Sequence, residues 1–323
     1  MTAPALAGRR ASRPAPRRAA SGVLGRVIWL IVIAGFFIFF ALPVIWLLLA
    51  PTKTDAQLVS QSPLSFGSWH GLRLAWDHVA SFESGIIFTW LGNSAIYSFG
   101  ALAITLVTAI PAGYGLALTE FVGRKTLLTI TLIVMLMPSA ALVLPLFLEM
   151  NAVHEVGSIW SVILPFSLFP FGVYLVYIYF SSSVPQDLLA AARLDGCDEV
   201  RVFWHVALPL AKPVVALVAF FSFVANWNNF FLPLVMLPTD QAAPIQVGLN
   251  NLLASTPAFN PVAGGADLNF NRPELALTTL LAIAPILVVF LFSQRALVSG
   301  MLAGATKELS DASGVRHPAA AGA

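Results

Sequence analysis

Six long stretches of this chain are apolar and contain no charged side chain, and they constrain the fold more than any other feature. A helix needs about 20 apolar residues to cross the hydrocarbon core of a bilayer. Charged residues make up only 10% of the 323 residues, whereas they make up roughly 25% of a soluble domain. The sequence therefore predicts an all-α membrane protein with six transmembrane helices, over residues 27–50, 93–118, 126–148, 157–180, 213–237 and 275–293.

The positions of lysine and arginine predict how this bundle lies in the membrane. Cytoplasmic connections carry an excess of these residues. With the N-terminus inside, fourteen of the 17 fall on the cytoplasmic side, and only Lys53, Arg73 and Arg272 fall outside. We therefore expect a multi-pass protein of the cell membrane with both termini in the cytoplasm.

Composition divides the chain into three parts. Residues 1–26 are rich in Arg, Pro and Ala, which predicts a disordered, basic cytoplasmic segment. The apolar run that follows is about 24 residues long, which favours a membrane anchor over a cleaved signal peptide. We assign residues 27–300 to the membrane domain and residues 301–323 to a cytoplasmic tail.

One polar interruption on the cytoplasmic side, residues 183–213, is typical of two short helices joined by a turn. Ser183 and Gln186 have the spacing of a capping box, which predicts the start of the first helix. Gly196 is expected to end it, because glycine readily takes the left-handed conformation found after helix C-termini. Asp198 suits the N-terminus of a second helix. This pair is too polar to span the membrane.

Polar residues and prolines also occur inside the spans. The fifth span carries Asn226, Trp227, Asn228 and Asn229, and amides at membrane depth are costly unless they form hydrogen bonds. These residues either connect helices or face a polar route, and the sequence favours neither. The third and fourth spans contain helix-breaking prolines, which are tolerated where protein or a cavity satisfies the loosened backbone: Pro138, Pro145, Pro165 and Pro170.

Motifs for self-contained chemistry are missing from the sequence. It has no GxxxxGK[ST] loop for ATP, and no HExxH, CxxC or GxSxG. The six spans contain no Asp, Glu, Lys or Arg, which ion-coupled carriers usually place there. One outer turn holds Glu149, His154 and Glu155, too few ligands to predict a metal site. We expect no catalytic residue and no cofactor bound by this chain. The alternative class is a secondary transporter or channel that is not coupled to ATP.

Three motifs resemble those of the membrane subunits of ATP-binding-cassette (ABC) importers. The run from Ala191 to Gly196, followed by Phe203 and by Leu208-Pro209-Leu210, resembles the EAA motif. The Asn226-Trp227-Asn228-Asn229 segment and the C-terminal run from Gln294 to Lys307 resemble the carbohydrate importers of the maltose type. The resemblance extends over most of residues 27–307.

This resemblance implies a type I ABC importer permease fold with a cytoplasmic coupling helix. The implied partners are a second homologous permease, a cytoplasmic ATPase dimer that uses ATP and Mg, and an extracytoplasmic sugar-binding protein; nucleic acid is not implied. The implied residues of ATPase coupling are Ala190, Ala191, Ala192, Arg193, Asp195, Gly196, Phe203 and Pro209. The candidate substrate path is Asn226, Trp227, Asn228 and Asn229.

Two features depart from the family pattern. Ala190 stands where the motif usually begins with a glutamate, and Asp187, about one helical turn earlier, is the candidate replacement. The outer connection over residues 238–274 is long, and in relatives this connection can reach into the binding protein.

Overall fold

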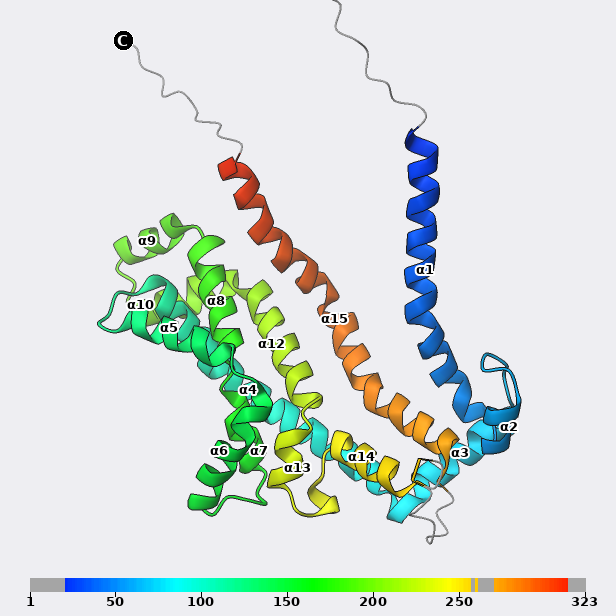
Figure 1. Ribbon diagram of the computed structural model, residues 1–323. Coiled ribbons are helices and arrows are strands. Elements are labelled where there is room, and N and C mark those ends of the chain that lie inside the picture. Colours follow the sequence, from blue (N-terminus) through cyan, green and yellow to red (C-terminus); the bar gives the residue numbers. More distant parts are fainter. Residues whose placement is uncertain (1–20, 257–258, 261–269, 313–323) are drawn as a thin grey trace, which may run out of the picture.

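The computed structural model describes residues 21–256, 259–260 and 270–312, and this part of the chain is helical with no strand (Figure 1). Four segments are long and apolar enough to cross a membrane, and two bent helix pairs raise the number to six if each is one crossing. The four are Gly25–Thr52, Ile86–Leu118, Trp160–Ser182 and Arg272–Gln294. The predicted all-α membrane fold is therefore confirmed.

Helix α4 (Ile86–Leu118) is the centre of the bundle. It packs against α7 (Trp160–Ser167), α8 (Pro170–Ser182) and α12 (Lys212–Trp227). Gly113 allows the close approach of α4 to α8, because a Cβ atom there would lie 2.5 Å from the side chain of Val176. Thr105 of α4 donates a hydrogen bond to the carbonyl of Ser167, and Ser222 of α12 donates to Thr105. These hydroxyl groups connect helices inside the bundle.

Three of the predicted spans are broken near their middle. Helices α5 (Arg124–Met135) and α6 (Ser139–Ala152) meet at 107°, with Pro138 at the start of α6. Pro170 occupies the first turn of α8, directly after the break that ends α7. Pro145 and Pro165 lie inside α6 and α7 and do not end them. The fifth span breaks after Trp227 and continues as α13 (Phe231–Met236).

The helices at the two ends of the chain are longer than predicted. Helix α1 (Ser21–Leu49) begins six residues early, so the prediction of disorder is wrong for residues 21–26. No proline lies between Pro16 and Pro43 to stop the helix from extending beyond the membrane. Helix α15 (Arg272–Ala312) likewise continues into the predicted tail, so residues 301–312 are helical. Residues 1–20 and 313–323 lie outside the described part.

Short helices cover the end of the bundle at which α15 begins: α2 (Asp55–Ser60), α3 (Trp69–Ser81) and α14 (Ile245–Ser255). Polar side chains of α4 hold the connection that precedes α14. The indole of Trp90 donates to the carbonyl of Asp240 at 2.8 Å, and the hydroxyl of Tyr97 donates to that of Ala242 at 2.8 Å. Ser94 accepts from the backbone N–H of Ile245.

Candidate functional site

The polar interruption forms a helix pair at one end of the bundle, beside α5 and α8 (Figure 1). Helix α9 spans Gln186–Leu194 and α10 spans Glu199–Val202, as the sequence predicts. The predicted capping box is wrong. Ser183 is the C-cap residue that follows α8, where its N–H donates to the carbonyl of Tyr179, and Pro185 takes the N-cap position of α9. Proline fits there because the N–H that it lacks takes no part in the hydrogen bonds of the helix.

Gly196 ends α9 in the predicted left-handed conformation, with φ of +84°. Its N–H donates to the carbonyl of Arg193, and the N–H of Cys197 donates to that of Ala192, both at 3.1 Å. These two bonds define a Schellman motif, which satisfies carbonyls that a helix C-terminus leaves unpaired. A residue with a Cβ would be strained at Gly196, although the space around it is open.

The second helix starts as predicted, since the carboxylate of Asp198 accepts a hydrogen bond from the N–H of Arg201 at 2.8 Å. A π-helical turn, Phe203–Ala207, then joins α10 to the short α11 (Leu208–Leu210). Pro209, inside α11, has no N–H to donate to the carbonyl of His205, so the chain lacks one helical hydrogen bond next to the π-helical turn.

Buried apolar side chains anchor this helix pair to the bundle. Leu189 and Val202 are fully buried in a cluster with Val176 and Phe180 of α8. Phe203 is also buried and packs edge-on against Tyr114 of α4. Phe203 therefore holds the helix pair in place and is not part of its outward surface.

A polar network that the sequence did not reveal also ties the pair to α4. The guanidinium of Arg193 donates two hydrogen bonds to the carboxylate of Glu199, at 2.9 and 3.1 Å. The hydroxyl of Tyr114 donates to the same carboxylate. The hydrogen bonds from Arg193 lower the pKa of Glu199, so this carboxylate stays ionised near neutral pH. No sequence spacing links Tyr114 to Glu199, because the two residues lie on different helices.

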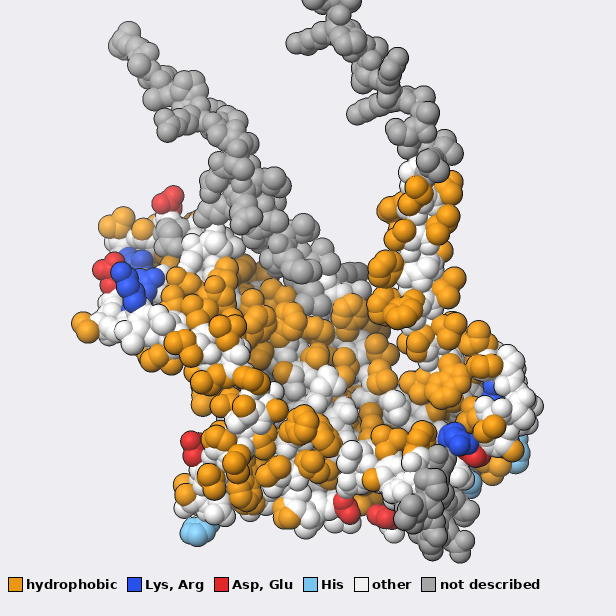
Figure 2. Space-filling view, in the orientation of Figure 1, with side chains coloured by type: hydrophobic (Ala, Val, Ile, Leu, Met, Phe, Trp, Pro, Cys, Tyr) orange, Lys and Arg blue, Asp and Glu red, His pale blue; other side chains and the backbone are white. Residues whose placement is uncertain are grey.

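The outward side of α9, which we call the α9 face, combines apolar and acidic side chains. Leu194 is 88% exposed and Leu188 is 49% exposed, although both are apolar residues outside the membrane spans. With Ala190 and Ala191 between them, the two leucines form a contiguous exposed apolar surface, which makes this side of α9 a candidate interaction surface. The face consists of Asp187, Leu188, Ala190, Ala191 and Leu194. Figure 2 shows basic and acidic groups gathered at this end of a largely apolar surface.

Six of the eight residues predicted for ATPase coupling are exposed: Ala190, Ala191, Arg193, Asp195, Gly196 and Pro209. Ala192 is half-buried against the apolar cluster, and Phe203 is buried. The small side chains of Ala190 and Ala191 leave the α9 backbone open to close approach by another surface. The structure thus divides the predicted set into an outward group and an anchoring group.

A cavity of about 680 Å³ lies where the three broken spans meet. The break between α5 and α6 contributes Met137, and the break between α7 and α8 contributes Phe169. The break after α12 contributes Asn228 and Asn229. Non-helical backbone at membrane depth is tolerated where it lines a cavity. This volume is within the range of ligand sites, which have mostly apolar walls and a few polar groups.

The four predicted path residues also divide into two groups, one that lines the cavity and one that connects helices. Asn226, Asn228 and Asn229 line the cavity. Asn226 and Asn228 each donate to a carbonyl of their own helix, at 2.8 and 3.1 Å, whereas the amide nitrogen of Asn229 is buried with no hydrogen-bond partner among the described residues. Trp227 is buried elsewhere, and its indole N–H donates to the carbonyl of Ala282 in α15. Trp227 connects helices, so its assignment to the path is not supported.

A helical membrane bundle with broken spans around a cavity, and with an anchored helix pair at one end, suits a transport subunit. A family model for the binding-protein-dependent transport system inner membrane component matches residues 109–303. The chain belongs to this family. It is a multi-pass membrane component without an ATPase site of its own, and a separate subunit hydrolyses ATP.

Curated relatives and one solved structure agree with this family. The chain is 31% identical to the arabinooligosaccharides transport system permease protein AraQ of Bacillus subtilis, over 82% of this chain and 90% of the relative. It is 29% identical to the trehalose transport system permease protein SugB of Mycobacterium tuberculosis, over 82% and 92%. A bacterial ABC transporter involved in the import of alginate has a chain with the same fold, at a TM-score of 0.74 and 20% identity, over 87% and 99%.

Proposed function

We propose that this chain is the permease subunit of an ABC importer for an oligosaccharide or a sugar derivative. The observation that supports this most directly is the α9 face, an exposed surface on a helix pair that is fixed to the bundle. The chain carries no nucleotide-binding motif, so the energy of ATP must reach it through such a surface. The names of the relatives, which include arabinooligosaccharide and trehalose systems, favour a sugar.

The α9 face docks on a cytoplasmic ATPase dimer, which binds ATP and Mg. Leu188 and Leu194 supply apolar contacts, and Ala190 and Ala191 allow close approach. Asp187 is exposed on the same face and supplies the acid that Ala190 lacks. Since Leu189, Phe203 and the Arg193–Glu199–Tyr114 network fix the pair to α4 and α8, movement of the ATPase is transmitted to the helices around the cavity.

A second, homologous permease completes the path, and a binding protein delivers the sugar from outside. Helix α1 stands away from the bundle (Figure 1), and its apolar side chains are exposed, with Phe37 at 71% and Phe39 at 72%. Such a surface faces lipid or the partner permease. The cavity amides of Asn226, Asn228 and Asn229 supply polar contacts for sugar hydroxyls among phenylalanine side chains. Both termini lie in the cytoplasm, which places the α9 face on the side of the ATPase.

Sugar uptake into proteoliposomes tests this proposal. The chain is co-reconstituted with a partner permease, an ATPase and a binding protein, and labelled arabinooligosaccharides and trehalose are supplied outside. The proposal predicts uptake that requires both internal ATP and the binding protein. Uptake driven by a proton or sodium gradient without ATP would instead establish a secondary transporter and overturn the proposal.

A further inference from the structure

Helix α3, in the first outer connection, carries an exposed stripe of aromatic and basic side chains. Trp69, Leu72, Arg73 and Trp76 recur at the i, i+3, i+4, i+7 spacing that places residues on one side of a helix. Trp69 is 74% exposed and Trp76 is 44% exposed. The four side chains line a shallow groove of about 320 Å³. We call these four residues the α3 stripe.

The residues on the other sides of α3 show how the helix is oriented relative to the bundle. Ala75 and Val79 are buried against the bundle. His70 and Asp77, on another side, are exposed and polar. The helix thus has a buried side, an aromatic side and a third side on which Leu74, 41% exposed, lies between His70 and Asp77.

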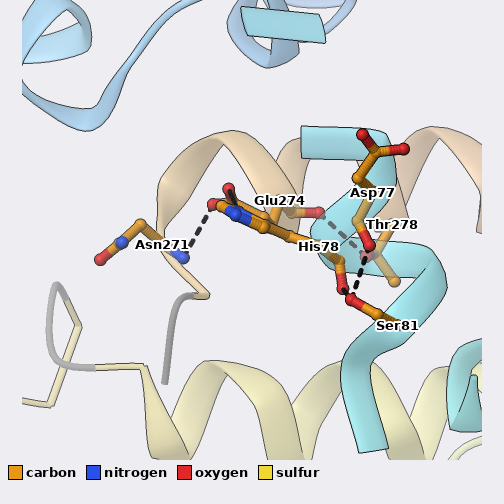
Figure 3. A network of polar contacts seen from close by, with 6 residues as sticks. All are labelled: Asp77, His78, Ser81, Asn271, Glu274 and Thr278. Atoms are coloured by element: carbon orange, nitrogen blue, oxygen red, sulfur yellow. Dashed lines mark hydrogen bonds and ion pairs between the residues drawn. The ribbon is translucent and has the colours of Figure 1, made fainter. Parts of the chain in front are cut away.

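Contacts with α15 hold α3 in this orientation. The imidazole Nδ1 of His78 lies 2.9 Å from a carboxylate oxygen of Glu274, which is buried at 6% exposure (Figure 3). The second oxygen of Glu274 accepts from the N–H of Asn271. Because α15 is a membrane-spanning helix, these bonds fix α3 at the level where the span leaves the outer side of the membrane.

The α3 stripe continues onto the exposed side of another spanning helix. The ring of Trp76 lies 6.0 Å from that of Phe88, in the first turn of α4, in an edge-on arrangement. Phe88 is itself 42% exposed. At the other end, Trp69 lies 5.2 Å from Phe66. The result is a row of four aromatic rings at the outer end of the spans, where tryptophan is enriched in membrane proteins.

Arg73 differs from the other two basic residues on the outer side. The amine of Lys53 donates to the carbonyl of Ser62 at 2.7 Å, and Arg272 pairs with Asp55 at 3.0 Å. Arg73 is exposed between the two tryptophans and has no hydrogen bond or ion pair with any described residue. Guanidinium groups bind phosphate through paired hydrogen bonds.

We propose that the α3 stripe binds the headgroup of a phospholipid in the outer leaflet of the membrane. The phosphate pairs with Arg73, and the rings of Trp69 and Trp76 lie on either side at the depth of the headgroups. The lipid-bound stripe holds the outer connection flat on the membrane and sets the height of the bundle. This site is independent of ATP coupling and of the sugar path.

Spin labelling of the full-length chain in nanodiscs of phosphatidylglycerol and phosphatidylcholine tests the position of the stripe. Cys197 is the only cysteine, so Cys197→Ser provides a background for single labels. The proposal predicts that labels at Leu72→Cys and Trp76→Cys collide more often with oxygen than with a water-soluble nickel chelate. Labels at His70→Cys and Asp77→Cys, the matched controls, should show the opposite order. Labels at 72 and 76 that are as accessible to nickel as the controls, or are shielded from both reagents by another protein, would overturn it.

Native mass spectrometry of the same full-length chain tests the phosphate contact. Arg73→Gln should lower the amount of retained phosphatidylglycerol about fivefold, the effect expected for one basic residue near an anionic surface. Arg73→Lys keeps the charge and should retain most of the lipid, and His70→Gln should change nothing. Equal retention by Arg73→Gln and the unsubstituted chain would overturn the phosphate contact, whatever the labels show.

Discussion

The helix pair over residues 183–213 and the asparagine segment over residues 226–229 are both polar interruptions of an apolar chain, yet they are built in opposite ways. The helix pair buries its apolar anchors and directs the α9 face outward. The asparagine segment buries Trp227 against α15 and directs its amides into a cavity between broken helices. One arrangement suits a protein partner, and the other suits a small polar solute.

This difference shows that residue type alone does not assign a role in such a chain. Phe203 and Trp227 both lie within motifs of functional residues, and both are structural supports. Exposed leucines and cavity-lining amides are the residues that can meet a partner. Four predictions follow that separate supports from contact residues.

Gly196→Trp has the largest expected effect on ATP-driven uptake. The left-handed conformation costs a residue with a Cβ about 1–2 kcal/mol, and the indole also enlarges the docking surface. We expect ATP-driven uptake to fall by more than about tenfold, which corresponds to 1.4 kcal/mol, while the chain still inserts. Uptake in proteoliposomes and membrane yield measure the two effects.

Gly123→Trp is the matched control. Gly123 also has a positive φ, +93°, and open space around it, but it lies in the connection before α5. Uptake should stay near normal. Equal loss in both variants would mean that backbone strain alone explains the effect and that the α9 face has no special role.

Leu189→Ala should destabilise the protein by about 2–5 kcal/mol, because it leaves a cavity in a packed cluster. Leu194→Ala removes the same atoms from a residue that is 88% exposed. It should leave the thermal midpoint unchanged and weaken co-purification with the ATPase. A similar loss of stability in both variants would contradict the division into anchor and contact residues.

Trp227→Phe removes a buried indole N–H and the hydrogen bond by which it joins α12 to the carbonyl of Ala282 in α15, at a cost of about 0.5–1.5 kcal/mol. We expect a lower thermal midpoint with no change in the choice of sugar. Asn229→Leu should affect sugar uptake and not stability, since the amide nitrogen that it removes has no hydrogen-bond partner among the described residues. Its stability should hold while the KM for sugar rises. Uptake kinetics that change only in Trp227→Phe would reverse the two assignments.

Glu199→Gln has the smallest expected effect, because the Arg193–Glu199 pair is partly exposed, and such pairs contribute about 0.2–1 kcal/mol. The pKa of Glu199 is lowered in the folded protein. The contribution of the ion pair to the free energy of unfolding is therefore complete above pH 4.5, the usual pKa of a glutamate, and is lost only as the pH falls through the folded-state pKa. The thermal midpoint of the variant should therefore fall slightly and equally at pH 6 and pH 8. A difference that disappears at pH 6 would contradict this.

Local sequence rules predicted the fold and the helix pair well. Apolar runs of membrane length overlap the four continuous candidate spans and both bent helix pairs, and Gly196 and Asp198 marked the turn and the second helix. These features depend on residues that are close in sequence, such as a glycine that ends a helix. The capping box failed because Ser183 was already used to end α8.

Contacts between distant residues could not be predicted in this way. The hydrogen bond from Tyr114 to Glu199 depends on how two helices pack against each other in three dimensions. The same is true of the cavity, which is lined by residues from three helix breaks. The sequence also left open whether the asparagines connect helices or face a route. The structure assigns the two roles to different residues. The three asparagine side chains line the cavity, whereas the indole of Trp227 forms a hydrogen bond to α15.

Photo-crosslinking at the α9 face tests the central claim most directly. In a Cys197→Ser background, a cysteine-linked photoreactive group is placed at Leu194, 88% exposed, or at Val122, which is fully exposed in the connection before α5. The complex is irradiated in membranes, and the partners are identified by mass spectrometry. The account predicts that position 194 crosslinks to an ATPase subunit far more strongly than position 122. No ATPase crosslink at position 194, or an equal yield at both positions, would contradict it.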